Sequence, residues 1–153
     1  MHKMCYLYLH ILCSTAISRS FMSCRLEDIL IFCRIFVLAG RTCTLRKEPK
    51  SDFRRRFRLN DEMKDYVTEK GLGCIGMHAA DIIRKRLAPA VIPNDGKQTP
   101  MKGHPVFVAQ HATGCCCRGC LSKWHGIDAG RELTAAEQEY VVALLLTWIS
   151  RQL

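Results

Sequence analysis

The sequence predicts a mainly α-helical fold: a small α+β domain with three to four helices, one short strand and a loop that holds cysteines and histidines for a metal site. Apolar residues recur at helical spacing in several segments. Four cysteines fall within six positions, at 115, 116, 117 and 120. The length of 153 residues suits one domain with a single core, and 48% hydrophobic with 24% charged residues is typical of a globular protein.

The chain divides near Pro49 into a poorly defined N-terminal extension, residues 1–48, and a single small Cys/His-containing domain, residues 49–153. Residues 1–47 hold seven Lys or Arg against two acidic residues, whereas residues 48–153 hold sixteen against twelve. The first part shows no helix caps and no clear apolar period. We therefore expect it to result from a start codon assigned too early, with a cleaved leader or a membrane-surface helix as the alternatives.

Two helices are predicted in the first half of the domain. One begins after Asn60, a favourable N-cap, carries acidic residues in its first turns and ends at Gly71. The next runs from about Cys74 to Leu87, because basic residues fill its last turn and Pro89 stops it. His78 lies within the apolar face of this helix, which indicates a core histidine with a satisfied hydrogen bond.

Three further elements are predicted after an irregular stretch. The apolar run Val106 to Ala109 is typical of a short buried strand. A short helix from roughly Arg118 to His125 is closed by Gly126. The last helix has a capping box formed by Thr134 and Glu137, followed by apolar residues at helical spacing.

Several unusual blocks fill the domain from residue 84 onward. They read RKRLAP at 84–89, NDGKQTPM at 94–101, GHPVF at 103–107, AQHAT at 109–113, CCRGCL at 116–121, KWHG at 123–126 and GRELT at 130–134. With these blocks the chain resembles a small bacterial domain family of unknown function over about Ser51 to Leu153. The resemblance implies no reaction, because the family has no assigned activity. A small residue is usual in that family where this chain has Cys115, so we do not count Cys115 as a ligand.

The cysteine-rich loop predicts a metal site. Thiolate and imidazole are the usual ligands of zinc, and the C-x2-C spacing lets one loop present two thiolates to one ion. If a helix starts near Cys117, the thiols of Cys116 and Cys117 lie within about 40° and 60° of Cys120, so all three can converge. The predicted ligands are His111, Cys116, Cys117 and Cys120, with His125 and His104 as substitutes. We expect Zn²⁺, with iron or an iron–sulfur cluster as the alternative.

Three roles for such a site remain open. A closed site would stabilise a binding or interaction module. A site with an open coordination position would activate water in a metal-dependent hydrolase, with His104 or Asp95 as general base. A metal-free cluster would serve a thiol redox protein, because a helix N-terminus and the adjacent Arg118 lower thiol pKa values. The sequence assigns no reaction, so whether the protein is an enzyme is open.

Two basic clusters form a candidate surface for nucleic acid, other anions or an acidic protein partner. They are Arg54, Arg55, Arg56 and Arg58, which interleave with Phe53 and Phe57, and Arg84, Lys85 and Arg86. The alternative is a solvated face with favourable charges at a helix C-terminus. Adjacent cysteines do not suit a disulfide scaffold, so we expect a reducing compartment, the cytoplasm. No stretch reaches the roughly 18 apolar residues of a transmembrane helix.

Overall fold

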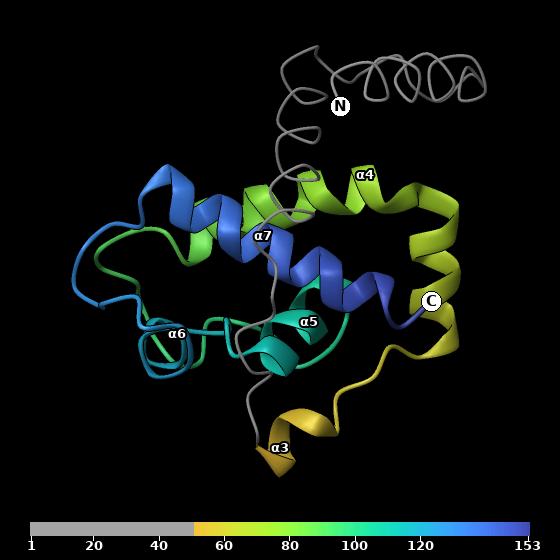
Figure 1. Cartoon of the computed structure of the whole chain (residues 1–153), viewed down its shortest axis with the longest axis horizontal. Helices are drawn as coiled ribbons and strands as arrows, with labels where there is room; N and C mark the ends of the chain where they lie inside the picture. The colour runs from red at the N-terminus through yellow and green to blue at the C-terminus, as the bar shows by residue number, and fades with distance from the viewer. Residues whose placement is uncertain (1–50) are drawn as a thin grey trace, which may run out of the picture. The chain divides into compact units, whose positions relative to one another are not determined.

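The computed structural model describes residues 51–153, which form five helices and no strand. The helices are α3 (Asp52–Arg55), α4 (Asp61–Arg86), α5 (Pro105–Thr113), α6 (Arg118–His125) and α7 (Ala135–Ser150) (Figure 1). The predictions for the N-terminal extension lie outside the described residues. No helix within 51–153 is long and apolar enough to cross a membrane.

Helix α4 joins the two helices predicted in the first half of the domain. Asn60 caps its start, because the Asn60 side chain accepts a hydrogen bond from the Met63 amide over 3.0 Å. Gly71 interrupts it with φ 78° and ψ 151°, and Figure 1 shows the resulting sharp bend. Glycine adopts this left-handed φ without the clash that a Cβ would cause. The predicted stop at Gly71 is therefore a bend between two helical segments, the second of which ends at Arg86.

The predicted strand at Val106 to Ala109 is wrong, because these residues lie in helix α5. The His104 side chain caps this helix by accepting from the Val106 amide, Pro105 occupies its first turn, and Gly114 ends it with φ 80°. A short apolar run fits a buried helix as well as a buried strand. Here the N-terminal cap with its proline and the C-terminal glycine favour the helix over the strand. The described residues are therefore all-α rather than α+β, and they contain five helices instead of three to four.

The structure confirms the two helices that were predicted in the C-terminal part of the chain. Helix α6 spans Arg118–His125 and is closed by Gly126, which has φ 68°. Helix α7 begins after Thr134, whose side chain accepts from the Glu137 amide while the Glu137 carboxylate accepts from the Thr134 amide. Both halves of the capping box are thus present.

The hydrophobic core lies where α4, α5 and α7 pack together. Figure 1 shows α7 running beside the second segment of α4, with α5 against them. The fully buried side chains include Ile75, Ile83, Val106, Leu145 and Ile149. Helix α6 contributes Leu121, which is also fully buried.

Arg118, at the start of α6, binds two loops to this helix. Its side chain is 2% exposed, and its guanidinium donates to the carbonyls of Leu87, Asp128 and Arg131. Since these carbonyls belong to the chain after α4 and the chain before α7, Arg118 fixes the position of α6 against both. A buried guanidinium that satisfies three carbonyls is an anchor of the fold.

Candidate metal centre

The loop from Gly114 to Cys117 presents the cysteines. Gly114 ends α5 in the left-handed region, and a Cβ added there would lie 2.9 Å from Cδ1 of Trp124. Only glycine therefore fits this turn without displacing the indole ring of α6. After the turn, Cys117 is extended, with φ −159° and ψ 169°, and acts as the N-cap of α6. Its Sγ accepts a hydrogen bond from the Cys120 amide over 3.3 Å.

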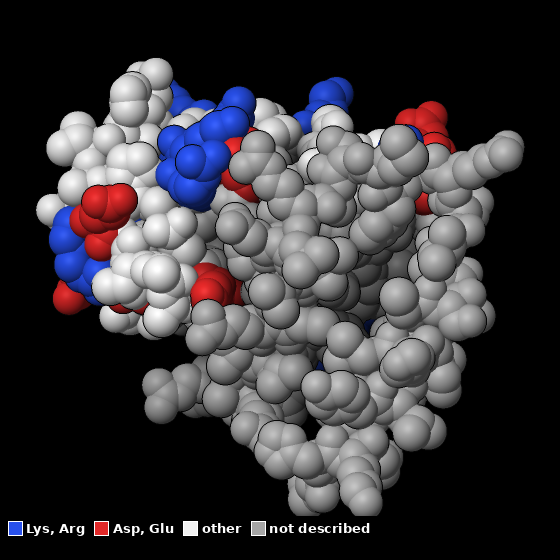
Figure 2. Space-filling model, turned by 90° about the horizontal axis from the view of Figure 1, so that it is seen from above, with Lys and Arg blue, Asp and Glu red and all other residues white. Residues whose placement is uncertain are grey.

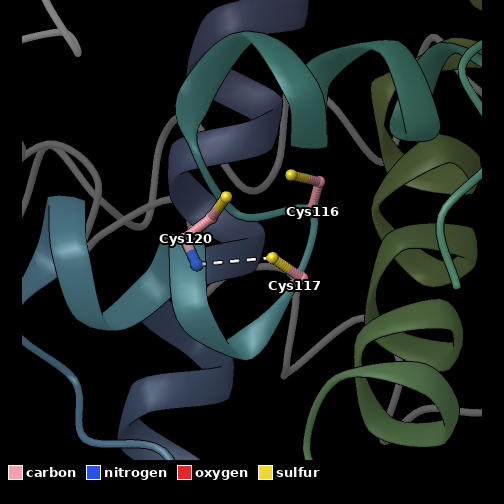
Figure 3. A group of neighbouring side chains, drawn as sticks. All are labelled: Cys116, Cys117 and Cys120. Carbon is pink, nitrogen blue, oxygen red and sulfur yellow. Dashed lines mark hydrogen bonds between the residues drawn. The ribbon is translucent and has the colours of Figure 1, made fainter. Parts of the chain in front are cut away.

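The thiols of Cys116, Cys117 and Cys120 converge. Their three Sγ atoms all lie within 4.8 Å of one another, and within residues 51–153 this is the one such group of three potential metal ligands (Figure 3). In a tetrahedral zinc site with Zn–S bonds of about 2.3 Å, neighbouring sulfurs are roughly 3.8 Å apart. Small side-chain rotations would close the group to that spacing. The cluster therefore has the chemistry and approximate geometry to hold a metal ion, which confirms the predicted convergence of these thiols.

Burial keeps the Cys117 thiol protonated when no metal is bound. Burial raises the pKa of the Cys117 thiol to about 12, although the hydrogen bond from the Cys120 amide opposes this effect. At neutral pH, a thiol with a raised pKa carries its proton, so a metal must displace that proton to bind. Binding of a metal at this site would therefore release a proton.

Arg54 is the charged neighbour of the cysteine group. It is 8% exposed, and its guanidinium donates to the Cys120 Sγ over 3.0 Å and to the His111 carbonyl. The guanidinium also lies 5.5 Å from the ring centroid of Trp124. The guanidinium thus places a positive charge directly beside the Cys120 sulfur. The sequence placed Arg54 on an anion-binding surface, whereas the structure buries it beside the cysteines.

His111 is buried, but its ring is directed to backbone carbonyls. Its Nε2 lies 3.2 Å from the carbonyl oxygens of both Thr99 and Pro100, and its ring stacks on Phe57 at 5.4 Å between centroids. Carbonyls only accept hydrogen bonds, so Nε2 carries the proton, and Nδ1 of the neutral ring has a free lone pair. The structure does not place His111 within the group of converging sulfurs.

His125 belongs to a different contact, at the far end of α6. Its Nε2 lies 2.8 Å from the Thr113 carbonyl and 3.5 Å from the Cys115 Sγ, while its Nδ1 lies 3.0 Å from the Tyr140 hydroxyl. Burial lowers the pKa of His125 and raises that of the Cys115 thiol to about 12. The Cys115 thiol thus contacts His125 and is not a member of the group of three converging sulfurs.

His104 lies at the N-terminus of α5, whereas the cysteines follow its C-terminus. A nine-residue helix is about 13 Å long, so His104 is separated from the cysteine loop by that length. Its imidazole contacts His78 instead. Of the six predicted ligands, the structure brings together Cys116, Cys117 and Cys120, and it gives the three histidines other partners.

The irregular segment before α5 holds the cysteine loop from the other side. The Thr99 hydroxyl donates to the Cys116 carbonyl over 2.8 Å, and the Asp95 carboxylate accepts from the Arg118 amide over 3.1 Å. Asp95 therefore supports the start of α6. Sequence reasoning missed the roles of Thr99 and Arg54, because no local pattern connects these residues to cysteines so distant in the chain.

The remaining basic residues are spread over exposed positions. Arg84 and Lys85 both pair with Asp81, at 2.8 and 2.7 Å, while the Arg86 guanidinium lies 5.6 Å from the Phe107 ring centroid. The exposed members of the first cluster are Arg55, Arg56 and Arg58. Figure 2 shows one face of the molecule, on whose described part basic side chains lie next to acidic ones.

Comparison with protein families finds one match. Residues 42–150 match the family described as domain of unknown function DUF4186, which covers more than half of the chain and the whole cysteine cluster. No solved structure matches the chain significantly. The family match confirms the resemblance to a domain family of unknown function. The chain therefore belongs to the DUF4186 family.

Proposed function

We propose that this domain is a metal-stabilised module in which Cys116, Cys117 and Cys120 coordinate a zinc-type ion. The observation that carries the proposal is the convergence of the three Sγ atoms within 4.8 Å. Thiolates are soft ligands, which select zinc or iron over calcium and magnesium. The bound ion would join the loop after α5 to the first turn of α6, so its role would be to hold these elements together.

His111 is our proposed fourth ligand. Its Nε2–H is already donated to the carbonyls of Thr99 and Pro100, which is the outer contact that orients ligating histidines, and its Nδ1 keeps a lone pair. A shift of the cysteine loop toward the ring, which leaves these two contacts in place, would bring the ion to Nδ1. Four protein ligands make a closed, structural site. Three thiolates and Zn²⁺ carry a net charge of −1, which the adjacent Arg54 guanidinium offsets.

Elemental analysis of the full chain, purified without a histidine tag, tests the metal. We expect one zinc per chain, and thiols of Cys116, Cys117 and Cys120 that react only after a chelator is added. Five further cysteines lie in residues 1–50, so the decisive comparison is between variants. Cys120→Ala should lose the metal, whereas Cys115→Ala, the matched control at the adjacent cysteine, should keep it.

Either of two results would overturn the proposal. One is full metal retention by Cys120→Ala. The other is a metal-free protein with freely reactive thiols, which would favour the thiol redox alternative. Visible absorbance with bound iron would keep the ligands but replace zinc by an iron centre.

His111→Ala tests whether the site is closed. A closed site predicts that this variant binds metal more weakly in competition with a chelator, with Phe57→Leu as the control for the lost ring stacking. Unchanged affinity in His111→Ala would mean that the fourth position is not filled by His111. An open position would then favour the metal-dependent hydrolase, whose activity should disappear in Cys120→Ala.

A binding surface for phosphates is a second candidate, supported by the exposed pair of Phe53 and Arg56. The Arg56 guanidinium lies 5.4 Å from the Phe53 ring centroid, and Phe53 is 44% exposed although it is aromatic. Such a pair suits a phosphate and a stacked base. We expect binding of single-stranded RNA at low salt that weakens as salt rises and disappears in the Arg55→Gln, Arg56→Gln double variant. No binding at low salt would remove this candidate.

A further inference from the structure

A second cluster of reactive side chains lies at the bend of α4, apart from the cysteine loop. The Cys74 Sγ lies 3.6 Å from the Nε2 of His78, and the Nδ1 of His78 lies 3.2 Å from the Nε2 of His104. All three side chains are half-buried. The sequence predicted a satisfied core histidine at position 78, but the structure connects this histidine to a thiol on one side and to an imidazole on the other.

The helix cap of α5 determines the direction of these hydrogen bonds. The Val106 amide donates to the Nδ1 of His104 over 3.2 Å, so the neutral ring carries its proton on Nε2. Burial lowers the pKa of His104, and the neighbouring His78 lowers it further, so this ring is neutral at pH 7. The His104 Nε2–H therefore donates to the Nδ1 of His78, whose own proton is then on Nε2 and points to the Cys74 Sγ.

This arrangement is a chain of donors and not a chelating group. His78 uses its two ring nitrogens for two different neighbours, and one ion cannot bind both nitrogens of one ring. In both hydrogen bonds of this series, the donated proton points toward Cys74. A sulfur that accepts an N–H is stabilised as the thiolate, the nucleophilic form of cysteine.

The position of Cys74 in α4 is a further feature that favours negative charge at the sulfur. Gly71 breaks the helical dihedrals of α4, so Cys74 lies in the first turn of the segment that follows, where the helix dipole favours negative charge.

We propose that Cys74 is a nucleophilic thiol, activated by His78 and oriented through His104, that exchanges with low-molecular-weight disulfides. In the step, the Cys74 thiolate attacks one sulfur of the disulfide and forms a mixed disulfide, while the other sulfur leaves as a thiolate. The leaving thiolate needs no proton from the protein. A reaction of this kind suits a site in which the neighbouring side chains donate hydrogen bonds to the attacking sulfur. A free thiol reverses the reaction.

Mass spectrometry of the full chain tests the proposal. Cleavage after Lys70 and Arg84 gives the peptide 71–84, in which Cys74 is the only cysteine. Iodoacetamide measures nucleophilicity and glutathione disulfide measures exchange, each at pH 7 and each in folded and urea-unfolded protein. We expect the folded protein to react at Cys74 about three to ten times faster than the unfolded one, because only the fold directs the His78 N–H to the sulfur.

Variants of the two histidines separate activation from structure. His78→Leu should slow both reactions to the unfolded rate, while His78→Gln, which keeps an amide N–H near the position of Nε2, should retain part of the acceleration. His104→Asn keeps a favourable N-cap for α5 but removes the donor to His78, so an intermediate rate is expected. Lys85→Gln, on an exposed position of the same helical segment, is the matched control and should react like the wild type.

Three outcomes would overturn the proposal. Cys74 could react no faster in the folded protein than in the unfolded one, or His78→Leu could leave both rates unchanged. Acceleration with iodoacetamide but not with glutathione disulfide would refute exchange with disulfides. All three readouts concern the peptide 71–84, so they do not depend on whether the cysteine loop binds a metal.

Discussion

The Arg54 guanidinium donates a hydrogen bond to the Cys120 Sγ over 3.0 Å, although the two residues are 66 positions apart in the chain. Arg54 also donates to the His111 carbonyl. The short helix α3 therefore supplies a buried positive charge to the cysteine cluster, which α5 and α6 present.

Arg54→Gln should weaken metal binding at the cysteine cluster. Partners around a metal site that orient its ligands and balance their charge change affinity by about 10- to 100-fold when they are lost. Competition with a chelator measures the change, and Arg55→Gln, at an exposed neighbouring position, is the control. Equal affinities in the two variants would contradict a role for Arg54 at the site.

Gly114→Ala should destabilise the protein more than Gly130→Ala. Both glycines have φ near 80°, but a Cβ at Gly114 would lie 2.9 Å from Trp124, whereas a Cβ at Gly130 would meet nothing within 4 Å. The left-handed φ alone costs a residue with a Cβ about 1–2 kcal/mol. The comparison by urea unfolding therefore isolates the contact with the indole ring. Equal losses would show that Trp124 moves aside freely.

Arg118→Met should lower the free energy of unfolding by about 3 kcal/mol, because the carbonyls of Leu87, Asp128 and Arg131 lose their donor in a buried site. Urea unfolding measures the loss. Lys97→Met, on an exposed loop position, should change stability little. A loss below about 1 kcal/mol in Arg118→Met would mean that water replaces the guanidinium.

Glu137 should make stability depend on acid pH. The hydrogen bond from Arg131 lowers the pKa of Glu137 from 4.5 to about 2, and the Thr134 amide adds to this. A carboxylate with a lowered pKa stabilises the fold above pH 4.5, and this stabilisation is lost as the pH falls toward 2. Because the pair is near the surface, we expect less than about 1 kcal/mol.

Glu137→Gln is the matched variant for this effect, since glutamine preserves the capping box but has no charge. Between pH 4.5 and 2, wild-type stability should fall toward that of Glu137→Gln. Taking the difference between the two proteins removes the other effects of acid on stability, which both share. Parallel pH curves would contradict the contribution of Glu137.

The sequence by itself determined the features that depend on neighbouring residues. The capping box of Thr134 and Glu137, the helix Arg118–His125 and the convergence of three thiols all follow from positions within a few residues of one another. Local geometry is sufficient for these, because one or two helical turns set the distances involved. The same local reasoning misplaced Val106 to Ala109 in a strand, since a short apolar run does not distinguish the two buried elements.

Only the tertiary structure decided which distant side chains surround each cysteine. Arg54 beside Cys120, the Thr99 and Pro100 carbonyls at His111, and His104 beside His78 are contacts between separate elements. The apolar packing of α4, α5 and α7 brings them together, and packing specifies burial without specifying polar partners. For that reason, the sequence does not tell a histidine that could bind zinc from a histidine that is hydrogen-bonded toward a thiol. Only the fold distinguishes the two.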